Sequence, residues 1–392
     1  MINSDQTVFV SLQLNVKDRL SQLRDWKAEW ERADYYLEQR IAQLSDSVQD
    51  QQVAMQIAGL KKRMELTLIQ RPLELSEELI IEAGGYQPLQ DFLHAEFAAL
   101  TTTERILWLN NFKMIMTPDL RELEKKIVDI RGYRMLGQQR NFLLGGESGM
   151  GKTTFLNWLI YRNLPRVEME RNHIPILAID APTDHKSPIP LYRWLISACG
   201  YSYLKGDTES ELLGKVILFF LKCGVEIVMV DEIEHLTKHA IRRKLLEISN
   251  LTPGVTYICA SCAPMNFVEG DVEIQGRWND IFELELYKGE RLDRLLSYLE
   301  LLLPFSKPSD LVRRTLETSP DSDEVVDGPA QVIENLTGGI LRDIMILIID
   351  SSKRAIERNL PSLTVMVIQD AWRNIQSKDP RVKQDKQSFQ KT

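Results

Sequence analysis

Residues Gly145 to Phe155 read GGESGMGKTTF, a glycine-rich segment between the apolar run NFLLGG and the helical pattern TFLNWLIYRNL. The segment contains the motif G-x-x-x-x-G-K-[ST] in full, after a predicted strand and before a predicted helix. Glycines let the backbone amides curl around an anion at the start of a helix, where the helix dipole favours negative charge. The segment therefore predicts a loop that binds the phosphates of a nucleotide.

The positions of this loop have different expected roles. Lys152 should neutralise the β- and γ-phosphates of ATP, and the hydroxyl of Thr153 should bind Mg²⁺. The expected cofactor-binding residues are Gly146, Glu147, Ser148, Gly149, Met150, Gly151, Lys152, Thr153 and Thr154.

A second motif, VEIVMVDEIEH, follows later in the chain. Asp231 ends a buried apolar strand, where it can hold Mg²⁺ through water, and Glu232 can orient and polarise the attacking water. An aspartate alone would fit a nucleotide switch or a small-molecule kinase, whereas the Asp-Glu pair favours hydrolysis. His235 and His239 lack the acid-between-histidines pattern of a zinc protease. They are interpreted as exposed helix histidines.

Short apolar runs alternate with helical patterns through the middle of the chain. This alternation indicates an α/β fold, with a P-loop parallel sheet covered by helices on both faces. Residues 89–116 are predicted to be helical, and the leucine spacing after Gly289 predicts a small all-helical lid. The predicted divisions are 1–85 for an N-terminal helical hairpin, 86–289 for the nucleotide-binding domain, 290–376 for the lid and 377–392 for a basic disordered tail.

The composition sets wider bounds. The 392-residue chain is 44% hydrophobic and carries a net charge of −8, so nucleic-acid contact requires local positive clusters. No apolar run approaches the ~18–20 residues of a membrane span, and no signal peptide is visible. Four cysteines favour a reducing cytoplasm. Cys259 and Cys262 form a CxxC without the second pair of a zinc site, and we interpret them as a buried strand and its exit.

Three further polar positions fit an oligomeric ATPase. Ser261 ends the next strand, where a small polar side chain could hold the hydrolytic water or the γ-phosphate. Arg277 lies just before the last strand of the sheet, from where it could reach a neighbouring subunit's phosphate. Arg342 begins a helix of the lid, so domain closure could bring it onto the nucleotide. With Glu232, these three residues are the expected catalytic set.

The order of these motifs resembles the AAA+ ATPases. Within that group, KCGVEIVMVDEIEHL and ASCAPMNFVEGDVEIQGRW are similar to the TniB/TnsC transposition regulators of Tn7-like and CRISPR-associated transposons. The resemblance covers about residues 90–375 and is strongest around Gly145–Thr153 and Lys222–Leu236. The chain departs from the family in its longer N-terminal hairpin and in Ser261, which replaces a threonine or asparagine.

The resemblance implies an ATP-dependent assembly factor. ATP-bound subunits would form a ring or helical filament around double-stranded DNA and link a target-selection protein to the transposase. Hydrolysis would then dismantle the assembly. Two other classes stay open: a helicase loader or replication-initiator ATPase with the same core, and a nucleotide-gated signalling ATPase.

The expected DNA site lies in two loops after the predicted strand IPILAID. Lys186 belongs to the loop APTDHKSPIP, and Lys205 belongs to YLKGDT. Repetition of one or two lysines along a ring or filament would supply the positive charge that a single subunit lacks. The alternative is that both are ordinary solvated lysines.

Overall fold

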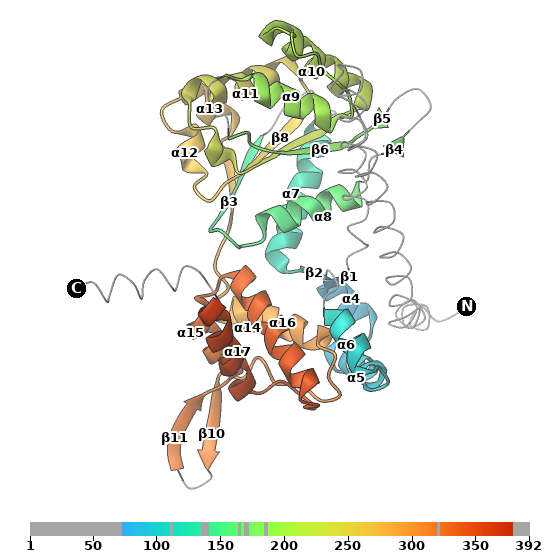
Figure 1. Ribbon diagram of the computed structural model, residues 1–392, viewed down its shortest axis with the longest axis vertical. Helices are drawn as coiled ribbons and strands as arrows, with labels where there is room; N and C mark the ends of the chain where they lie inside the picture. Colours follow the sequence, from blue (N-terminus) through green and yellow to red (C-terminus); the bar gives the residue numbers. More distant parts are fainter. Residues whose placement is uncertain are drawn as a thin grey trace, which may run out of the picture. The chain divides into compact units, whose positions relative to one another are not determined.

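The computed structural model describes residues 73–109, 113–134, 141–163, 166–167, 172–183, 187–319 and 322–378 (Figure 1). Most of the predicted N-terminal hairpin and nearly all of the predicted tail lie outside these residues. The described residues form two compact units. The α/β unit is Pro118–Glu285, and the helical unit joins Leu73–Thr117 to the residues from Leu286 onward.

The α/β unit is built on a five-stranded sheet whose paired strands run parallel. Its order across the sheet is β6-β7-β8-β3-β9, so the first of these strands in the chain lies between the last two. The strands are β3 (Phe142–Gly146), β6 (Ile176–Asp180), β7 (Ile227–Asp231), β8 (Thr256–Ala260) and β9 (Asp280–Leu284). Because the strands are parallel, their carboxyl ends meet at one edge of the sheet.

Helices cover both faces of this sheet, as the sequence predicts (Figure 1). On one face are α9 (Ile189–Ala198), α10 (Glu209–Cys223) and α11 (His239–Leu251), and on the other are α7 (Pro118–Arg134) and α8 (Lys152–Arg162). The remaining elements of this unit are β4 (Arg166–Val167), β5 (Asn172–His173), η1 (Ile233–His235), α12 (Met265–Val268) and α13 (Val272–Arg277).

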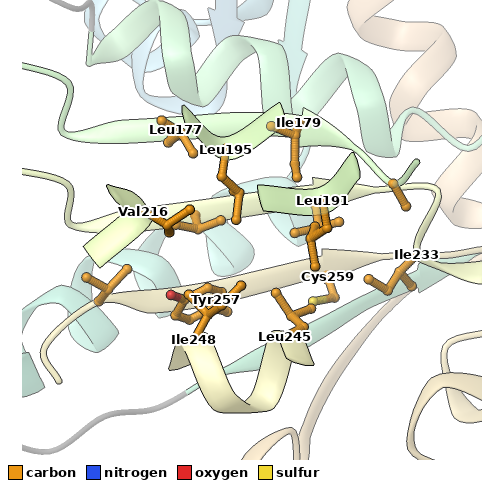
Figure 2. Close-up of a cluster of buried hydrophobic side chains, with 14 of the residues drawn as sticks. Leu177, Ile179, Leu191, Leu195, Val216, Ile233, Leu245, Ile248, Tyr257 and Cys259 are labelled. Atoms are coloured by element: carbon orange, nitrogen blue, oxygen red, sulfur yellow. The ribbon is translucent and has the colours of Figure 1, made fainter. Parts of the chain in front are cut away.

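The core of the α/β unit explains the near-continuous apolar strands in the sequence. Val228 and Val230 of β7 join a buried cluster with Leu195 of α9 and Leu245 of α11 (Figure 2). The alternate β7 residues are also buried but lie outside that cluster. Since successive side chains of a strand point to opposite faces, both faces of the sheet require apolar residues.

The helical unit combines two distant parts of the chain. Its first part contains β1 (Leu73–Ser76), α4 (Glu77–Glu82), α5 (Tyr86–Ala98), α6 (Thr102–Leu109) and β2 (Lys113–Met116). Its second part contains α14 (Glu290–Leu302), β10 (Thr315–Ser319), β11 (Ser322–Asp327), α15 (Pro329–Thr337), α16 (Leu341–Glu357) and α17 (Val365–Lys378).

Two hydrogen bonds join these parts. The Tyr86 hydroxyl donates to the Ser297 carbonyl oxygen at 3.1 Å, and the Trp108 indole donates to the Leu302 carbonyl oxygen at 2.8 Å. Helices α5 and α6 therefore group with the C-terminal helices, whereas the predicted nucleotide-binding domain of residues 86–289 includes them.

Two secondary-structure predictions for this unit are wrong in part. The predicted helix over 89–116 ends before Lys113–Met116, which form β2 and pair in parallel with Leu73–Ser76. The predicted all-helical lid contains an antiparallel hairpin, β10 with β11. Short strands carry little periodic signal, and their backbone partners decide their conformation. Among the helices of the described residues, none is long and apolar enough to cross a membrane.

Candidate nucleotide-binding site

The phosphate-binding loop connects β3 to α8 at the carboxyl edge of the sheet, as the motif predicts. Gly146 and Gly151 both have left-handed φ angles, +137° and +92°. At Gly146 an added Cβ would also lie 2.8 Å from the Leu284 carbonyl oxygen of β9. Glycine is therefore required where the loop leaves the strand, because any side chain would strike the backbone of the neighbouring strand.

The side chains of the predicted loop residues divide by exposure. Exposed residues are Glu147, Ser148, Thr153 and Thr154, whereas Met150 and Lys152 are buried. Met150 therefore packs inside the loop, and a contact between it and a nucleotide would come from its backbone.

Lys152 points back into its own loop. Its amino group donates to the carbonyl oxygens of Gly146 at 2.6 Å and Glu147 at 3.1 Å, and lies 3.5 Å from the sulfur of Cys262. An ammonium group has three hydrogens, so each one faces an acceptor. Phosphate oxygens could replace these acceptors without moving the buried stem of the side chain.

The two predicted metal ligands lie together. The Thr153 hydroxyl is 2.5 Å from one carboxylate oxygen of Asp231, at the end of β7. The other oxygen accepts a hydrogen bond from the Glu232 amide at 2.9 Å. A hydroxyl and a carboxylate are the hard oxygen ligands that Mg²⁺ prefers, with water and substrate phosphates completing the shell. The residues present therefore fit a magnesium ion held jointly with a nucleotide.

Glu232 has an unusual backbone. Its φ of 52° and ψ of 40° lie in the left-handed region, which costs a non-glycine residue roughly 1–3 kcal/mol. Its side chain is 59% exposed, with a carboxylate oxygen 3.5 Å from Nδ1 of His235. This strained turn leaves the Glu232 carboxylate largely solvated, as a group that activates water requires.

The predicted catalytic Ser261 has a different environment from the one expected. It follows β8, but it is 1% exposed, and its hydroxyl oxygen accepts a hydrogen bond from the Ala263 amide at 3.0 Å. The next residue, Cys262, is exposed and lies beside Lys152. Cys259 is buried, so the CxxC is a strand and its exit, as predicted.

The two predicted arginines lie in different units. Arg277 is the last residue of α13 and is exposed, and the following Trp278 is buried. Arg342 lies in the first turn of α16 in the helical unit, with its Nε 3.3 Å from the Asp343 carboxylate. A role for either arginine at a nucleotide stays a prediction.

Of the two predicted DNA-binding lysines, only Lys205 lies in the described residues. It is exposed in the turn between α9 and α10, and its carbonyl oxygen accepts a hydrogen bond from Arg193 at 3.3 Å. Lys186 lies outside the described residues.

Sequence reasoning missed a buried carboxylate that connects two helices of the α/β unit. The side chain of Asp271 is 1% exposed and accepts hydrogen bonds from the first turn of α13. From α11 it meets His239 and Arg243, each at 2.7 Å. Burial alone would raise the pKa of Asp271, but these hydrogen bonds outweigh it and lower the pKa to about 2. The aspartate is thus charged, and it ties the helix after the Asp-Glu pair to the helix that carries Arg277.

Comparison with known proteins supports part of the resemblance. Residues 105–251 match the family model of the bacterial TniB protein. The match includes the phosphate-binding loop and the Asp-Glu pair, and it ends before Ser261, Arg277 and Arg342. No curated protein matches the chain.

Three solved structures illustrate the level of structural similarity. The ORC2 protein of Aeropyrum pernix has 12% identity and a TM-score of 0.44, covering 64% of this chain and 66% of its own. The ORC1 protein of Aeropyrum pernix in complex with DNA has 17% identity and a TM-score of 0.44, with coverages of 66% and 64%. The RuvB Holliday junction branch migration motor of Thermotoga maritima has 15% identity and a TM-score of 0.39, with coverages of 64% and 67%.

The chain therefore spans 64–66% of the length of the first two structures. The strand order of the sheet and the glycine-rich loop before α8 are features of this chain itself. The chain has an α/β fold with a five-stranded parallel sheet, and its residues 105–251 match the family model of the bacterial TniB protein.

Proposed function

We propose that the chain is an ATP-dependent regulator of DNA transposition. It hydrolyses ATP with Mg²⁺, assembles as a ring or filament on double-stranded DNA and connects target selection to the transposase. Hydrolysis drives disassembly. The observation that carries the ATPase part is the joint placement of Lys152, Thr153, Asp231 and Glu232 at one edge of the sheet. The match to the TniB family supports the transposition part.

Each residue has a role in the proposed chemistry. Lys152 exchanges acceptors in its present surroundings for the β- and γ-phosphates, and Thr153 and Asp231 hold Mg²⁺. The bound ion supplies charge neutralisation for the transferred phosphoryl group. Glu232 accepts a proton from the attacking water, since its carboxylate is solvated and directed by a strained turn.

Oligomerisation completes the proposed site. Arg277, exposed at the end of α13, reaches the nucleotide of a neighbouring subunit, and Arg342 senses the nucleotide within its own chain. Lys186 and Lys205 contact the DNA backbone. Residues 290–376 act as the lid, and the N-terminal extension serves as a brace or as a docking arm.

Two variants of the full chain test the hydrolytic assignment. Glu232→Gln should bind ATP but lose hydrolysis by ~10²–10⁴, the usual contribution of a general base, and should accumulate in the assembled state. Lys152→Ala should lose ATP binding and assembly together. Glu234→Gln is a matched control, because Glu234 is an exposed carboxylate of the same short helix. Wild-type turnover by Glu232→Gln would refute the assignment.

Negative-stain microscopy tests the assembly. Rings or filaments that require both ATP and duplex DNA support the transposition regulator. Assembly with ATP alone and no DNA affinity would instead favour a nucleotide-gated signalling ATPase. Loading of a helicase ring onto DNA by the purified chain would favour the helicase-loader class.

A further inference from the structure

One exposed cysteine lies beside the phosphate-binding loop, and the proposed hydrolysis does not use it. The chain has four cysteines. Cys199, Cys223 and Cys259 are buried, and Cys262 alone is exposed. Its sulfur lies 3.5 Å from the amino group of Lys152, although the two residues are 110 positions apart in the sequence.

The turn that carries Cys262 is anchored on the phosphate-binding loop. The Ser261 amide donates to the Leu144 carbonyl oxygen of β3 at 3.0 Å. Pro264 packs against the loop so closely that a Cβ added at Gly145 would lie 2.9 Å from its ring. Inside the turn, the Ser261 hydroxyl oxygen accepts the Ala263 amide at 3.0 Å. The turn therefore holds Ser261 inward and presents Cys262 to Lys152.

The partners of the Lys152 ammonium differ in strength. Two are backbone carbonyl oxygens of the loop, and the third is the thiol sulfur, a weak acceptor. A phosphate oxygen displaces the sulfur at the lowest cost. The terminal phosphate therefore most readily takes the place of the Cys262 sulfur next to the Lys152 ammonium.

We propose that Cys262, rather than Ser261, is the side chain at the end of β8 that positions Lys152 for the terminal phosphate of ATP. Cys262 holds the ammonium on the side of β8 until the nucleotide arrives and then lies against its third phosphate. This inference rests on the proposed ATP use of the site. Two consequences follow: ATP shields the thiol from solvent more than ADP does, and a bulky group on the thiol blocks ATP.

Alkylation of the full chain with N-ethylmaleimide tests the placement. Mass spectrometry should find Cys262 labelled and the three buried cysteines unlabelled in the folded protein. Saturating Mg²⁺–ATP should slow labelling several-fold in the Glu232→Gln background, where ATP persists, and saturating Mg²⁺–ADP should slow it much less. Protein labelled at Cys262 should fail to bind a fluorescent ATP analogue. Cys262→Ala, treated in the same way, should keep binding it.

Steady-state kinetics test the positioning role. Cys262→Ala should raise the KM for ATP several-fold, because the ammonium is no longer held at the position of the terminal phosphate before ATP binds, while the affinity for ADP stays within about twofold of wild type. Cys262→Ser should restore the KM for ATP, since its hydroxyl can accept the same ammonium hydrogen. A purely structural role would lower the melting temperature of both variants and would give no difference between ATP and ADP.

The failures of the two proposals are distinguishable. Suppose that the wild-type chain binds the fluorescent ATP analogue, ATP leaves the labelling rate of Cys262 unchanged, and Cys262→Ala has wild-type kcat and KM. The role of Cys262 is then refuted, and the ATPase proposal stands. Suppose instead that the chain binds no ATP at all. The ATPase proposal and the role that rests on it then fall together.

Discussion

The α/β unit and the helical unit differ in whether short, contiguous stretches of sequence predict which residues lie close together. In the α/β unit, Asp231 ends one apolar strand and Lys152 begins the helix after another, and the parallel sheet brings the strand ends together. The helical unit depends on pairs such as Tyr86 with Ser297, which are 211 positions apart. Chemistry at strand ends can thus be predicted from short motifs, whereas packing between distant helices cannot.

Each unit contains a buried carboxylate, and the pKa values of the two shift in opposite directions. Asp271 of the α/β unit accepts hydrogen bonds from the cation Arg243 and from His239, and its pKa is low. Glu300 of the helical unit accepts the backbone amides of Ser309 and Leu311, and the like charge of Asp310 also acts on it. Burial outweighs these two hydrogen bonds and raises the pKa of Glu300 above 4.5. Partner charge, rather than burial alone, decides whether a buried carboxylate keeps its charge.

The largest expected effect separates the arginines of the two units. Arg277→Ala should lose most hydrolysis, since an arginine supplied in trans contributes ~10³–10⁵ in other NTPases. Mixing it with Lys152→Ala should partly restore activity, because one intact site forms between unlike subunits. Mixing Arg342→Ala with Lys152→Ala should restore nothing, because both residues serve the same chain's nucleotide. ATPase assays across mixing ratios check both outcomes.

A co-sedimentation control must show that the variant subunits assemble together. Failure of the Arg277→Ala mixture under that condition would remove the trans role. Rescue by the Arg342→Ala mixture would make the helical unit, rather than the α/β unit, the source of the shared arginine.

A smaller effect is expected from removing a hydrogen bond that joins the two parts of the helical unit. Trp108→Phe leaves the buried Leu302 carbonyl oxygen without its donor, which should cost about 1–3 kcal/mol in the free energy of unfolding. Trp194→Phe is the matched control, because Trp194 is 42% exposed on α9 of the α/β unit. Urea unfolding measures both. A Trp108→Phe variant as stable as wild type would contradict the stabilising role of this hydrogen bond.

The buried carboxylates should give pH dependences of opposite sign. Asp271 has a pKa of about 2 in the folded state against 3.8 in the reference state, so its stabilisation is complete above pH 3.8 and is lost as pH falls toward 2. The folded pKa of Glu300 is raised above 4.5, so its ionisation lowers stability as pH rises past 4.5. Asp271→Asn and Glu300→Gln should each remove the corresponding slope from urea midpoints measured against pH. Wild-type slopes in both variants would refute the contrast.

The smallest expected effect concerns DNA. Replacing Lys186 and Lys205 by alanine should weaken binding of duplex DNA and reduce the slope of log K against log salt by about 1 per lysine. Binding should stay insensitive to sequence, since only phosphates are contacted. Lys222→Ala, an exposed lysine in the last turn of α10, is the control. An unchanged salt slope in the double variant would move the DNA site away from these loops.

The amino-acid sequence alone predicted the candidate nucleotide-binding residues and determined the strands that carry them. The loop from Gly146 to Thr154, the Asp231-Glu232 pair and the five parallel strands all follow from contiguous patterns. Each of these features depends on only a few neighbouring residues: an apolar run of strand length, a glycine-rich turn or the start of a helix. Their physical causes are therefore local. The position of Arg277 before the last strand was predicted for the same reason.

Only the tertiary structure decided which side chain at the end of β8 faces Lys152. An anchored turn buries the Ser261 hydroxyl and exposes Cys262, and no local pattern distinguishes these two neighbours. It also decided that Lys113–Met116 form a strand, because their partner is Leu73–Ser76, outside any local window. A four-residue strand or a two-residue turn is too short to show a hydrophobic periodicity of its own. Its structure is therefore decided by backbone hydrogen bonds with distant segments.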